Sequence, residues 1–197
     1  GARPLRGPMV SMLDAPDAEP VITWLKELTA GTFSHVILMT GEALRRLLGF
    51  AERAGMRDAV IAALSKVDTV TRGPKPVRAL KELGLSPSKV AAAPTTEGVI
   101  ASLREEDVAG QMVGVTLYGS DNPELVGFLR SAGATVRTVL SYVFAPAADD
   151  ERVAELIARL EQGTVDVIVF TSSPQVDRFV EVAKGRGLAE ALVRGLE

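Results

Sequence analysis

The chain has 197 residues, of which 47% are hydrophobic and 24% charged, a composition that supports a folded core and excludes wholesale disorder. Its formal net charge of -3 argues against a dedicated nucleic-acid binder, because phosphate contacts need a basic face. The absence of cysteine and the single histidine, His35, exclude disulfides, thiolate nucleophiles and multi-histidine metal sites within this sequence.

Short apolar runs rich in β-branched residues alternate along the chain with helical patterns. The runs predict strands at Met9–Leu13, His35–Met39, Val67–Thr71, Lys89–Ala92, Met112–Leu117, Thr135–Phe144 and Val165–Phe170. Between them, apolar residues recur at helical spacing, as in the stretches Leu44–Ala51 and Val153–Leu160. This alternation predicts an α/β fold with parallel strands and helices on both faces of the sheet.

The chain also repeats itself at an offset of about 131–132 residues. His35–Thr40 matches Asp166–Thr171, and the two-helix pattern of Leu44–Val60 matches that of Val176–Leu192, including the glycine between the helices. Any two β–α units resemble each other to some extent, so chance similarity stays open as an alternative. We favour the interpretation that the chain contains two homologous domains.

The positions of the two copies predict that one domain is inserted in the other. We expect two flavodoxin-like parallel-sheet domains joined by a two-stranded β hinge. Residues 14–140 form the complete inner domain, and residues 1–13 and 141–197 form the outer domain, which we expect to be incomplete because its terminal segments are missing. The strands expected to form the hinge are Met9–Leu13 and Ser141–Phe144.

Small, hydroxylated or glycine-bearing loops follow five of the expected strands, and each begins a helix. In doubly wound sheets, ligands bind beyond the carboxyl ends of the strands, where helix N–H groups and the helix dipole favour an anion. The hydroxyl side chains of these loops, such as Thr95, Thr96, Ser120 and Ser173, could individually be simple helix N-caps. The occurrence of five such loops together favours an anion-binding crevice. The loops are Thr40-Gly41, Arg72-Gly73-Pro74-Lys75, Pro94–Gly98, Tyr118–Asn122 and Thr171–Pro174.

A few further residues carry candidate chemistry. Tyr142 lies on an expected crossing strand and could donate a proton from its hydroxyl, although a structural role is equally open. Arg72 and Lys75 could add charge-assisted contacts to an anion or could be solvated surface. His35 and the acidic run Asp149–Glu151 are better explained by structure and helix capping. The sequence contains no G-x-G-x-x-G, Walker or G-x-S-x-G motif.

Several segments resemble, in order and spacing, the uroporphyrinogen-III synthase family. Thr71–Leu85 resembles that family's Gly-Pro-x-Thr-Ala-x-x-Leu-x-x-x-Gly element, and Pro94–Val99 resembles its Thr/Ser-Glu-x-Leu loop. Asp166–Pro174 is similar to its Phe-Thr-Ser-Pro motif, and Leu125–Val136 resembles the helix before the last inner-domain strand. Tyr142 falls where the family keeps a tyrosine. The resemblance covers essentially all 197 residues.

This resemblance implies a carbon–oxygen lyase that cyclises the linear tetrapyrrole hydroxymethylbilane to uroporphyrinogen III, with inversion of the last pyrrole ring and loss of water. It implies Tyr142 as the catalytic proton donor and neither a cofactor nor a metal. The residues expected to bind the substrate are Thr40, Gly73, Lys75, Thr95, Thr96, Gly98, Thr171, Ser172 and Ser173.

The expected protein is a cytoplasmic monomer, and this segment of it is expected to bind no nucleic acid. The longest purely apolar run, Ala59–Leu64, has about six residues, so no membrane span is expected, and the sequence does not open on a signal peptide. The absence of cysteine fits a reducing compartment.

Two departures from the family pattern keep other functions open. Leu38-Met39-Thr40-Gly41 replaces the inner-domain Phe-Thr-Ser motif, and Pro76 stands where threonine is usual. Related sequences also occur as ligand-sensing halves of transcriptional regulators, so the alternative is a non-catalytic tetrapyrrole or anion sensor on the same fold. A periplasmic-type solute receptor is disfavoured because no signal peptide is present.

Overall fold

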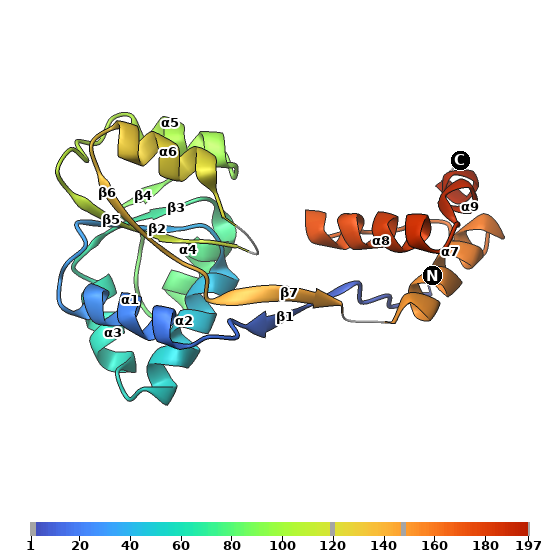
Figure 1. Ribbon diagram of the computed structural model, residues 1–197, viewed down its shortest axis with the longest axis horizontal. Helices are drawn as coiled ribbons and strands as arrows, with labels where there is room; N and C mark the ends of the chain where they lie inside the picture. The colour runs from blue at the N-terminus through green and yellow to red at the C-terminus, as the bar shows by residue number, and fades with distance from the viewer. Residues whose placement is uncertain (1–2, 119–120, 147–148, 197) are drawn as a thin grey trace. The chain divides into compact units, whose positions relative to one another are not determined.

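The computed structural model describes residues 3–118, 121–146 and 149–196, and strands alternate with helices along most of the chain (Figure 1). The strands are β1 (Val10–Asp14), β2 (His35–Leu38), β3 (Asp68–Thr71), β4 (Lys89–Val90), β5 (Met112–Thr116), β6 (Thr135–Val139) and β7 (Tyr142–Pro146). The helices are α1 (Glu19–Thr29), α2 (Gly41–Arg53), α3 (Arg57–Leu64), α4 (Pro74–Lys81), α5 (Thr96–Leu103), α6 (Pro123–Ser131), α7 (Asp150–Glu161), α8 (Ser173–Gly185) and α9 (Ala189–Leu196).

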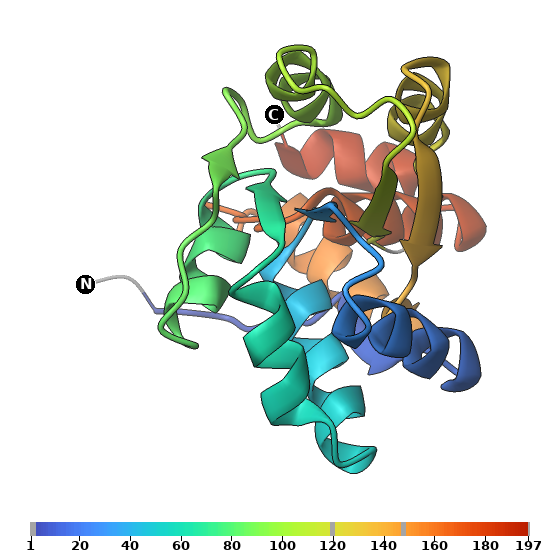
Figure 2. The ribbon, with the colours of Figure 1, turned by 90° about the vertical axis from the view of Figure 1, so that its left-hand side faces the viewer.

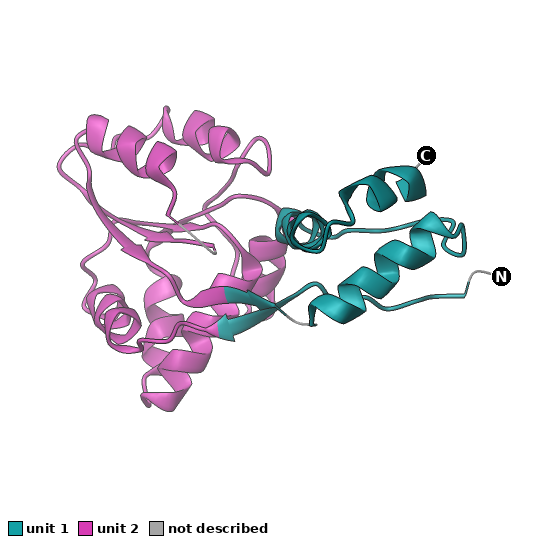
Figure 3. Ribbon diagram, turned by 45° about the vertical axis from the view of Figure 1, so that its right-hand side comes forward, with its two compact units in different colours: residues 1–13, 144–197 teal, residues 14–143 magenta. Residues whose placement is uncertain are grey.

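The chain divides into two compact units (Figure 3). Unit 1 consists of residues 1–13 and 144–197, and unit 2 consists of residues 14–143. The sequence placed the second boundary a few residues earlier, after residue 140. Unit 2 is therefore a single continuous segment, whereas unit 1 is built from both ends of the chain.

Unit 2 contains a parallel five-stranded sheet in the order β4-β3-β2-β5-β6. The expected α/β class with a parallel sheet between helices is confirmed. Counted from its first strand, the sheet has the order 3-2-1-4-5, an order found in doubly wound folds. The order reverses at β2, so β2 and β5 flank the topological switch point.

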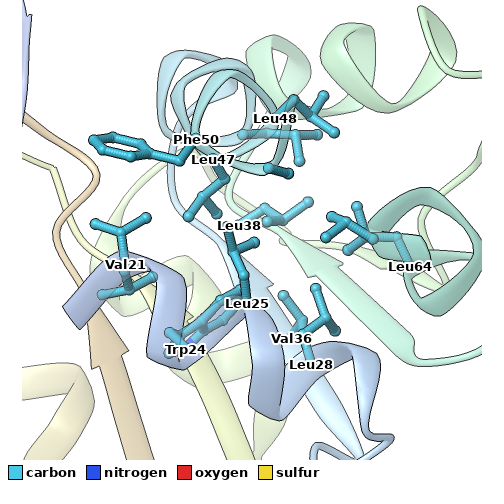
Figure 4. Close-up of a cluster of buried hydrophobic side chains, with 14 of the residues drawn as sticks. Val21, Trp24, Leu25, Leu28, Val36, Leu38, Leu47, Leu48, Phe50 and Leu64 are labelled. Carbon is cyan, nitrogen blue, oxygen red and sulfur yellow. The ribbon is translucent and has the colours of Figure 1, made fainter. Parts of the chain in front are cut away.

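Alternate residues of β2 enter two different cores, as expected for a strand buried on both faces. Val36 and Leu38 pack with the apolar sides of α1, α2, α3 and α4 (Figure 4). Ile37, and Met39 directly after the strand, pack with α5 and α6. Figures 1 and 2 show α5 and α6 on one face of the sheet and α1 to α3 on the other.

A two-stranded sheet pairs β1 with β7, as the sequence predicted for the crossing strands. Ser11 Oγ donates a hydrogen bond to the Ala145 carbonyl oxygen at 3.4 Å, which links the two strands through a side chain. The expected strand Thr135–Phe144 is divided into β6 and β7, which belong to different sheets. Movement of the pair as a hinge stays a prediction.

Unit 1 contains α7, α8 and α9, and one expected strand is absent from it. The segment Val165–Phe170 is described but is not a strand, which corrects the prediction. Within it, Val167 and Val169 are 75% and 76% exposed, whereas Ile168 packs against the core. A strand also needs a neighbouring backbone to exchange hydrogen bonds with, and no described segment pairs with this one.

The internal repeat is visible in the helices. The first helix of each copy, α2 and α8, has 13 residues, and the second helix of each copy, α3 and α9, has eight. The helix pairs are separated by Gly55 and Gly187, whose φ angles are 67° and 69°. Glycine adopts this left-handed conformation without a steric penalty, which explains its place after each helix. Homology between the two units stays a prediction supported by this similarity.

Candidate functional site in unit 2

Three neighbouring strands of unit 2 end level with one another at the switch point. Leu38 of β2 pairs in register with Thr71 of β3 on one side and with Thr116 of β5 on the other. The loops that follow these strands therefore emerge side by side, and they carry Thr40, Arg72 and Tyr118 respectively. Ligands of doubly wound sheets bind at this kind of position.

Close backbone contacts connect the loops into one rim. A Cβ on Gly41 would lie 2.6 Å from the Lys75 carbonyl oxygen, and a Cβ on Gly73 would lie 3.0 Å from Pro94 Cβ. A Cβ on Gly98 would lie 2.2 Å from the Ala93 carbonyl oxygen. Real Cβ atoms essentially never approach neighbours closer than 3.0 Å, so Gly41 and Gly98 are required for the observed packing.

The Tyr142 hydroxyl lies in this rim and contacts Thr40. Tyr142 is only 2% exposed, and its Oη is 3.3 Å from Thr40 Oγ1. Thr40 is also the N-cap of α2, because its Oγ1 accepts a hydrogen bond from the Ala43 N–H at 3.0 Å. Thr40 therefore fixes the start of a helix and orients the tyrosine hydroxyl at the same time.

Burial is the largest influence on the pKa of Tyr142, and it raises that pKa above the ordinary value for tyrosine. The hydrogen bond with Thr40 and the positive charge of Arg72 lower the pKa, whereas Glu42 and Tyr118 raise it. The net shift is upward, so the hydroxyl keeps its proton at neutral pH and can donate it.

Arg72 is held beside this group by an aromatic ring that the sequence analysis did not single out. Its guanidinium carbon lies 4.4 Å from the centroid of the Tyr118 ring. The backbone N–H of Arg72 donates to the Leu38 carbonyl oxygen at 3.1 Å, which continues the β2–β3 ladder by one residue. The sequence included Tyr118 only as the first residue of the loop Tyr118–Asn122, because that loop follows an expected strand, and it did not predict the stacking on Arg72. The other predicted residues of its loop include Gly119 and Ser120, which lie outside the described residues.

The loop before α5 holds its polar groups in hydrogen bonds within unit 2. Thr95 is the N-cap, and its Oγ1 accepts from the Gly98 N–H at 3.1 Å. Thr96 Oγ1 accepts from Asn122 Nδ2 at 3.0 Å, and Asn122 in turn caps α6. The backbone N–H of Glu97 is the main cause of the lowered pKa of its own carboxyl group, and Thr95 adds to this effect.

The remaining predicted residues lie in two further places. Lys75 is exposed in the first turn of α4, next to Gly73. Thr171, Ser172 and Ser173 are exposed in unit 1 at the start of α8, where Thr171 N–H donates to Gln175 Oε1 at 2.9 Å. The predicted residues thus form two groups: Tyr142, Thr40, Gly73, Lys75, Thr95, Thr96 and Gly98 in unit 2, and the three hydroxyl residues in unit 1.

Two general properties of the described residues bear on the chemistry. None of the helices formed by them is long and apolar enough to cross a membrane. Within residues 3–118, 121–146 and 149–196, no group of three or more acidic or histidine side chains could hold a metal ion. The groups that this site offers are hydroxyls, backbone N–H groups, the Arg72 guanidinium and the Lys75 ammonium group.

Comparisons with known proteins agree with this geometry. The family model described as uroporphyrinogen-III synthase HemD matches residues 1–195. The uncharacterized protein YjjA of Bacillus subtilis (strain 168) is 36% identical over 185 residues, which are 94% of this chain and 66% of YjjA. The chain thus spans just under two thirds of that relative's length.

Solved structures of uroporphyrinogen III synthase from the extremely thermophilic bacterium Thermus thermophilus are similar as well. A mutant crystal structure matches with a TM-score of 0.68 and 26% identity, covering 94% of this chain and 70% of the other. The wild-type structure matches with a TM-score of 0.59 and 26% identity, covering 94% and 75% of the two chains.

Proposed function

Because this chain belongs to the uroporphyrinogen-III synthase family, we propose that the protein closes linear hydroxymethylbilane to uroporphyrinogen III with inversion of the last pyrrole ring. The reaction releases water, so the enzyme is a carbon–oxygen lyase. The observation that carries the proposal is the family match over residues 1–195. The proton-bearing Tyr142 hydroxyl at the switch point supports it independently.

In the proposed mechanism, Tyr142 supplies the proton that the leaving hydroxyl needs. The bond between the terminal methylene and its oxygen breaks, the oxygen takes the phenol proton, and water departs. The azafulvene that remains is attacked by the last pyrrole ring to give a spiro intermediate, which opens and closes again with that ring inverted. The proton released on final ring closure returns to the tyrosine oxygen, so the enzyme is regenerated without an external reductant or oxidant.

The substrate carries eight carboxylates, and we propose that the loops at the sheet edge hold some of them. On unit 2, Thr40, Thr95 and Thr96 offer hydroxyl donors, Lys75 an ammonium group and Gly73 a backbone N–H. We propose that Gly98, whose own N–H is bonded to Thr95, lines the same loop. Thr171, Ser172 and Ser173 offer a second group at the start of α8 on unit 1. Several weak contacts suit a reaction in which positioning of the chain ends supplies much of the rate acceleration.

We further propose that the enzyme acts as a monomer in the cytoplasm. The absence of cysteine from the sequence supports a reducing compartment. The chemistry requires proton transfer and positioning rather than electron transfer, so we propose that it proceeds without a cofactor or metal.

The test uses the full chain and freshly generated hydroxymethylbilane, with the uroporphyrin isomers separated after oxidation. Unassisted closure without ring inversion gives the type I isomer, so enzyme activity is measured as the fraction of type III. A dominant type III product is expected. If the product stays type I while the protein binds uroporphyrin III, the non-catalytic sensor is the correct function.

A further inference from the structure

Arg72 differs from the other arginines of the described chain. Eight arginines form ion pairs with carboxylates: Arg45, Arg46, Arg53, Arg57, Arg137, Arg178, Arg186 and Arg194. Seven others have no carboxylate partner among the described residues, and all of them are exposed: Arg3, Arg6, Arg78, Arg104, Arg130, Arg152 and Arg159. Arg72 is the one described arginine that is partly buried and has no carboxylate partner.

A partly buried cation without a counter-ion needs another source of stabilisation. The face of the Tyr118 ring supplies part of it, because the guanidinium carbon lies 4.4 Å from the ring centroid. Stacking uses the flat face of the guanidinium and leaves the N–H groups at its edge available. No described residue accepts a hydrogen bond from the Arg72 side chain, so these donors can bind a ligand.

Arg72 lies at the switch point of the sheet. Arg72 follows β3 and Tyr118 follows β5, so their contact reaches across the end of β2, the strand that leads to Thr40. The positive charge of Arg72 also interacts with the Tyr142 hydroxyl and lowers its pKa. A ligand anion on Arg72 would therefore lie close to the proposed proton donor.

We propose that Arg72 binds one carboxylate of the tetrapyrrole and that Tyr118 holds its guanidinium in the binding position. This inference rests on the proposed function for the identity of the ligand. The planar guanidinium edge matches a carboxylate in a two-bond arrangement that an ammonium group does not reproduce. Arg72 is thus a specificity-determining residue, and Tyr118 is a positioning residue that acts through it.

The experiment measures binding of uroporphyrin III, the oxidised and fluorescent form of the product, to the full chain. Arg72→Gln should raise the dissociation constant about tenfold or more, the effect of one charge-assisted hydrogen-bonded pair. Arg104→Gln is the matched control, because Arg104 also lies over a ring, that of Phe128 at 5.9 Å, and its replacement removes the same charge from an exposed position. This control should change the dissociation constant less than twofold.

Tyr118 provides a second readout that a merely structural role would not produce. Tyr118→Phe keeps the ring, so its dissociation constant should match that of the unaltered protein. Tyr118→Leu removes the ring and should raise the dissociation constant, although by less than Arg72→Gln does. When Arg72→Gln is already present, Tyr118→Leu should raise the dissociation constant little further, because Tyr118 acts on binding by holding the arginine.

The outcomes separate the inference from the proposed function. Binding of Arg72→Gln within twofold of the Arg104→Gln control, or no binding by the unaltered protein, overturns the inference. Arg72-dependent binding together with a product that stays type I supports the inference and overturns the proposed enzyme. A rise in KM with an unchanged kcat in Arg72→Gln supports both, because the lost contact then belongs to substrate binding.

Discussion

The Tyr142 hydroxyl is the atom on which the proposed chemistry depends. Tyr142→Phe should lower turnover of hydroxymethylbilane by roughly 10²–10⁴-fold, the usual contribution of one positioned acid. The same change should lower the free energy of unfolding by about 0.5–1.5 kcal/mol, because the hydroxyl is buried and bonded to Thr40. Arg104→Gln, which removes an exposed charge outside the site, is the control and should keep its turnover. Unchanged turnover in Tyr142→Phe would remove Tyr142 from the mechanism and leave the fold assignment intact.

Asp14 connects the end of β1 to α2 and should make stability depend on pH. Its carboxylate accepts hydrogen bonds from Arg46 at 2.8 Å and from Arg53 at 2.7 Å, and the bond from Arg46 is the main cause of its lowered pKa. A carboxyl group with a lowered pKa in the folded state stabilises that state above its unfolded pKa. The stabilisation is lost as the pH falls through the folded pKa.

We therefore expect the free energy of unfolding of Asp14→Asn to fall less between about pH 5 and pH 3 than that of the unaltered protein. The partners are partly exposed, so solvent screening limits the change to about 0.2–1 kcal/mol. Urea midpoints at pH 6 and pH 3 measure it, with the exposed Glu155→Gln as control. An unchanged pH dependence in Asp14→Asn would contradict the assignment.

The sequence predicted part of the site because certain roles depend on position along the chain. Thr40 and Thr95 follow strands and begin helices, and the structure assigns both of them the N-cap role that the sequence left open. The stacking of Arg72 on Tyr118 was not predictable in this way. It joins two loops more than 40 positions apart in the sequence, and only the parallel register of three strands brings them together.

At the scale of elements, two helical glycines should respond in opposite ways to replacement by alanine. At one of them helix propensity decides the change in stability, and at the other packing decides it. Gly127 lies exposed inside α6, and a Cβ there would meet no atom within 4 Å. Gly127→Ala should therefore raise the free energy of unfolding by about 0.5–1 kcal/mol.

Gly41→Ala should have the opposite effect, although Gly41 also lies in a helix. Its Cβ would lie 2.6 Å from the Lys75 carbonyl oxygen, so α2 and the start of α4 would have to separate. Overpacking of this kind typically lowers stability by about 1–3 kcal/mol. Denaturant unfolding of the two variants measures whether each change raises or lowers the free energy of unfolding. A stabilised Gly41→Ala protein would show that the loops at the rim are not tightly packed.

Strand prediction succeeded where a segment lies beside another strand and failed where no described strand lies beside it. The apolar runs at β2, β3 and β5 are strands because each lies beside another within the same sheet. Val165–Phe170 has the same kind of pattern and no described strand beside it. Periodicity reports which side chains are buried, whereas a strand also requires a partner backbone, which a single segment of sequence cannot reveal.

At the scale of the whole molecule, the two units differ in what stabilises them. Unit 2 has a core on each face of its sheet, whereas the described part of unit 1 has one core among three helices. Unit 1 also exposes two valines of the segment Val165–Phe170. Regions with few buried apolar contacts and unpaired backbone open locally at a lower free energy than sheet cores do.

Hydrogen exchange of the full chain should therefore resolve two levels of protection. We expect amides of α7, α8 and α9 to exchange faster than those of β2, β3 and β5. Leu160→Ala truncates the unit 1 core, where Leu160 is 5% exposed, and should accelerate exchange in unit 1 alone. Its counterpart Leu38→Ala, in the core of unit 2, should accelerate exchange in the sheet. A Leu→Ala change in a core typically lowers stability by about 2–5 kcal/mol, enough to change protection by more than tenfold. If Leu160→Ala accelerated exchange in the sheet as strongly as in the helices of unit 1, the two units would unfold as one, and the difference in their stabilisation would not govern their opening.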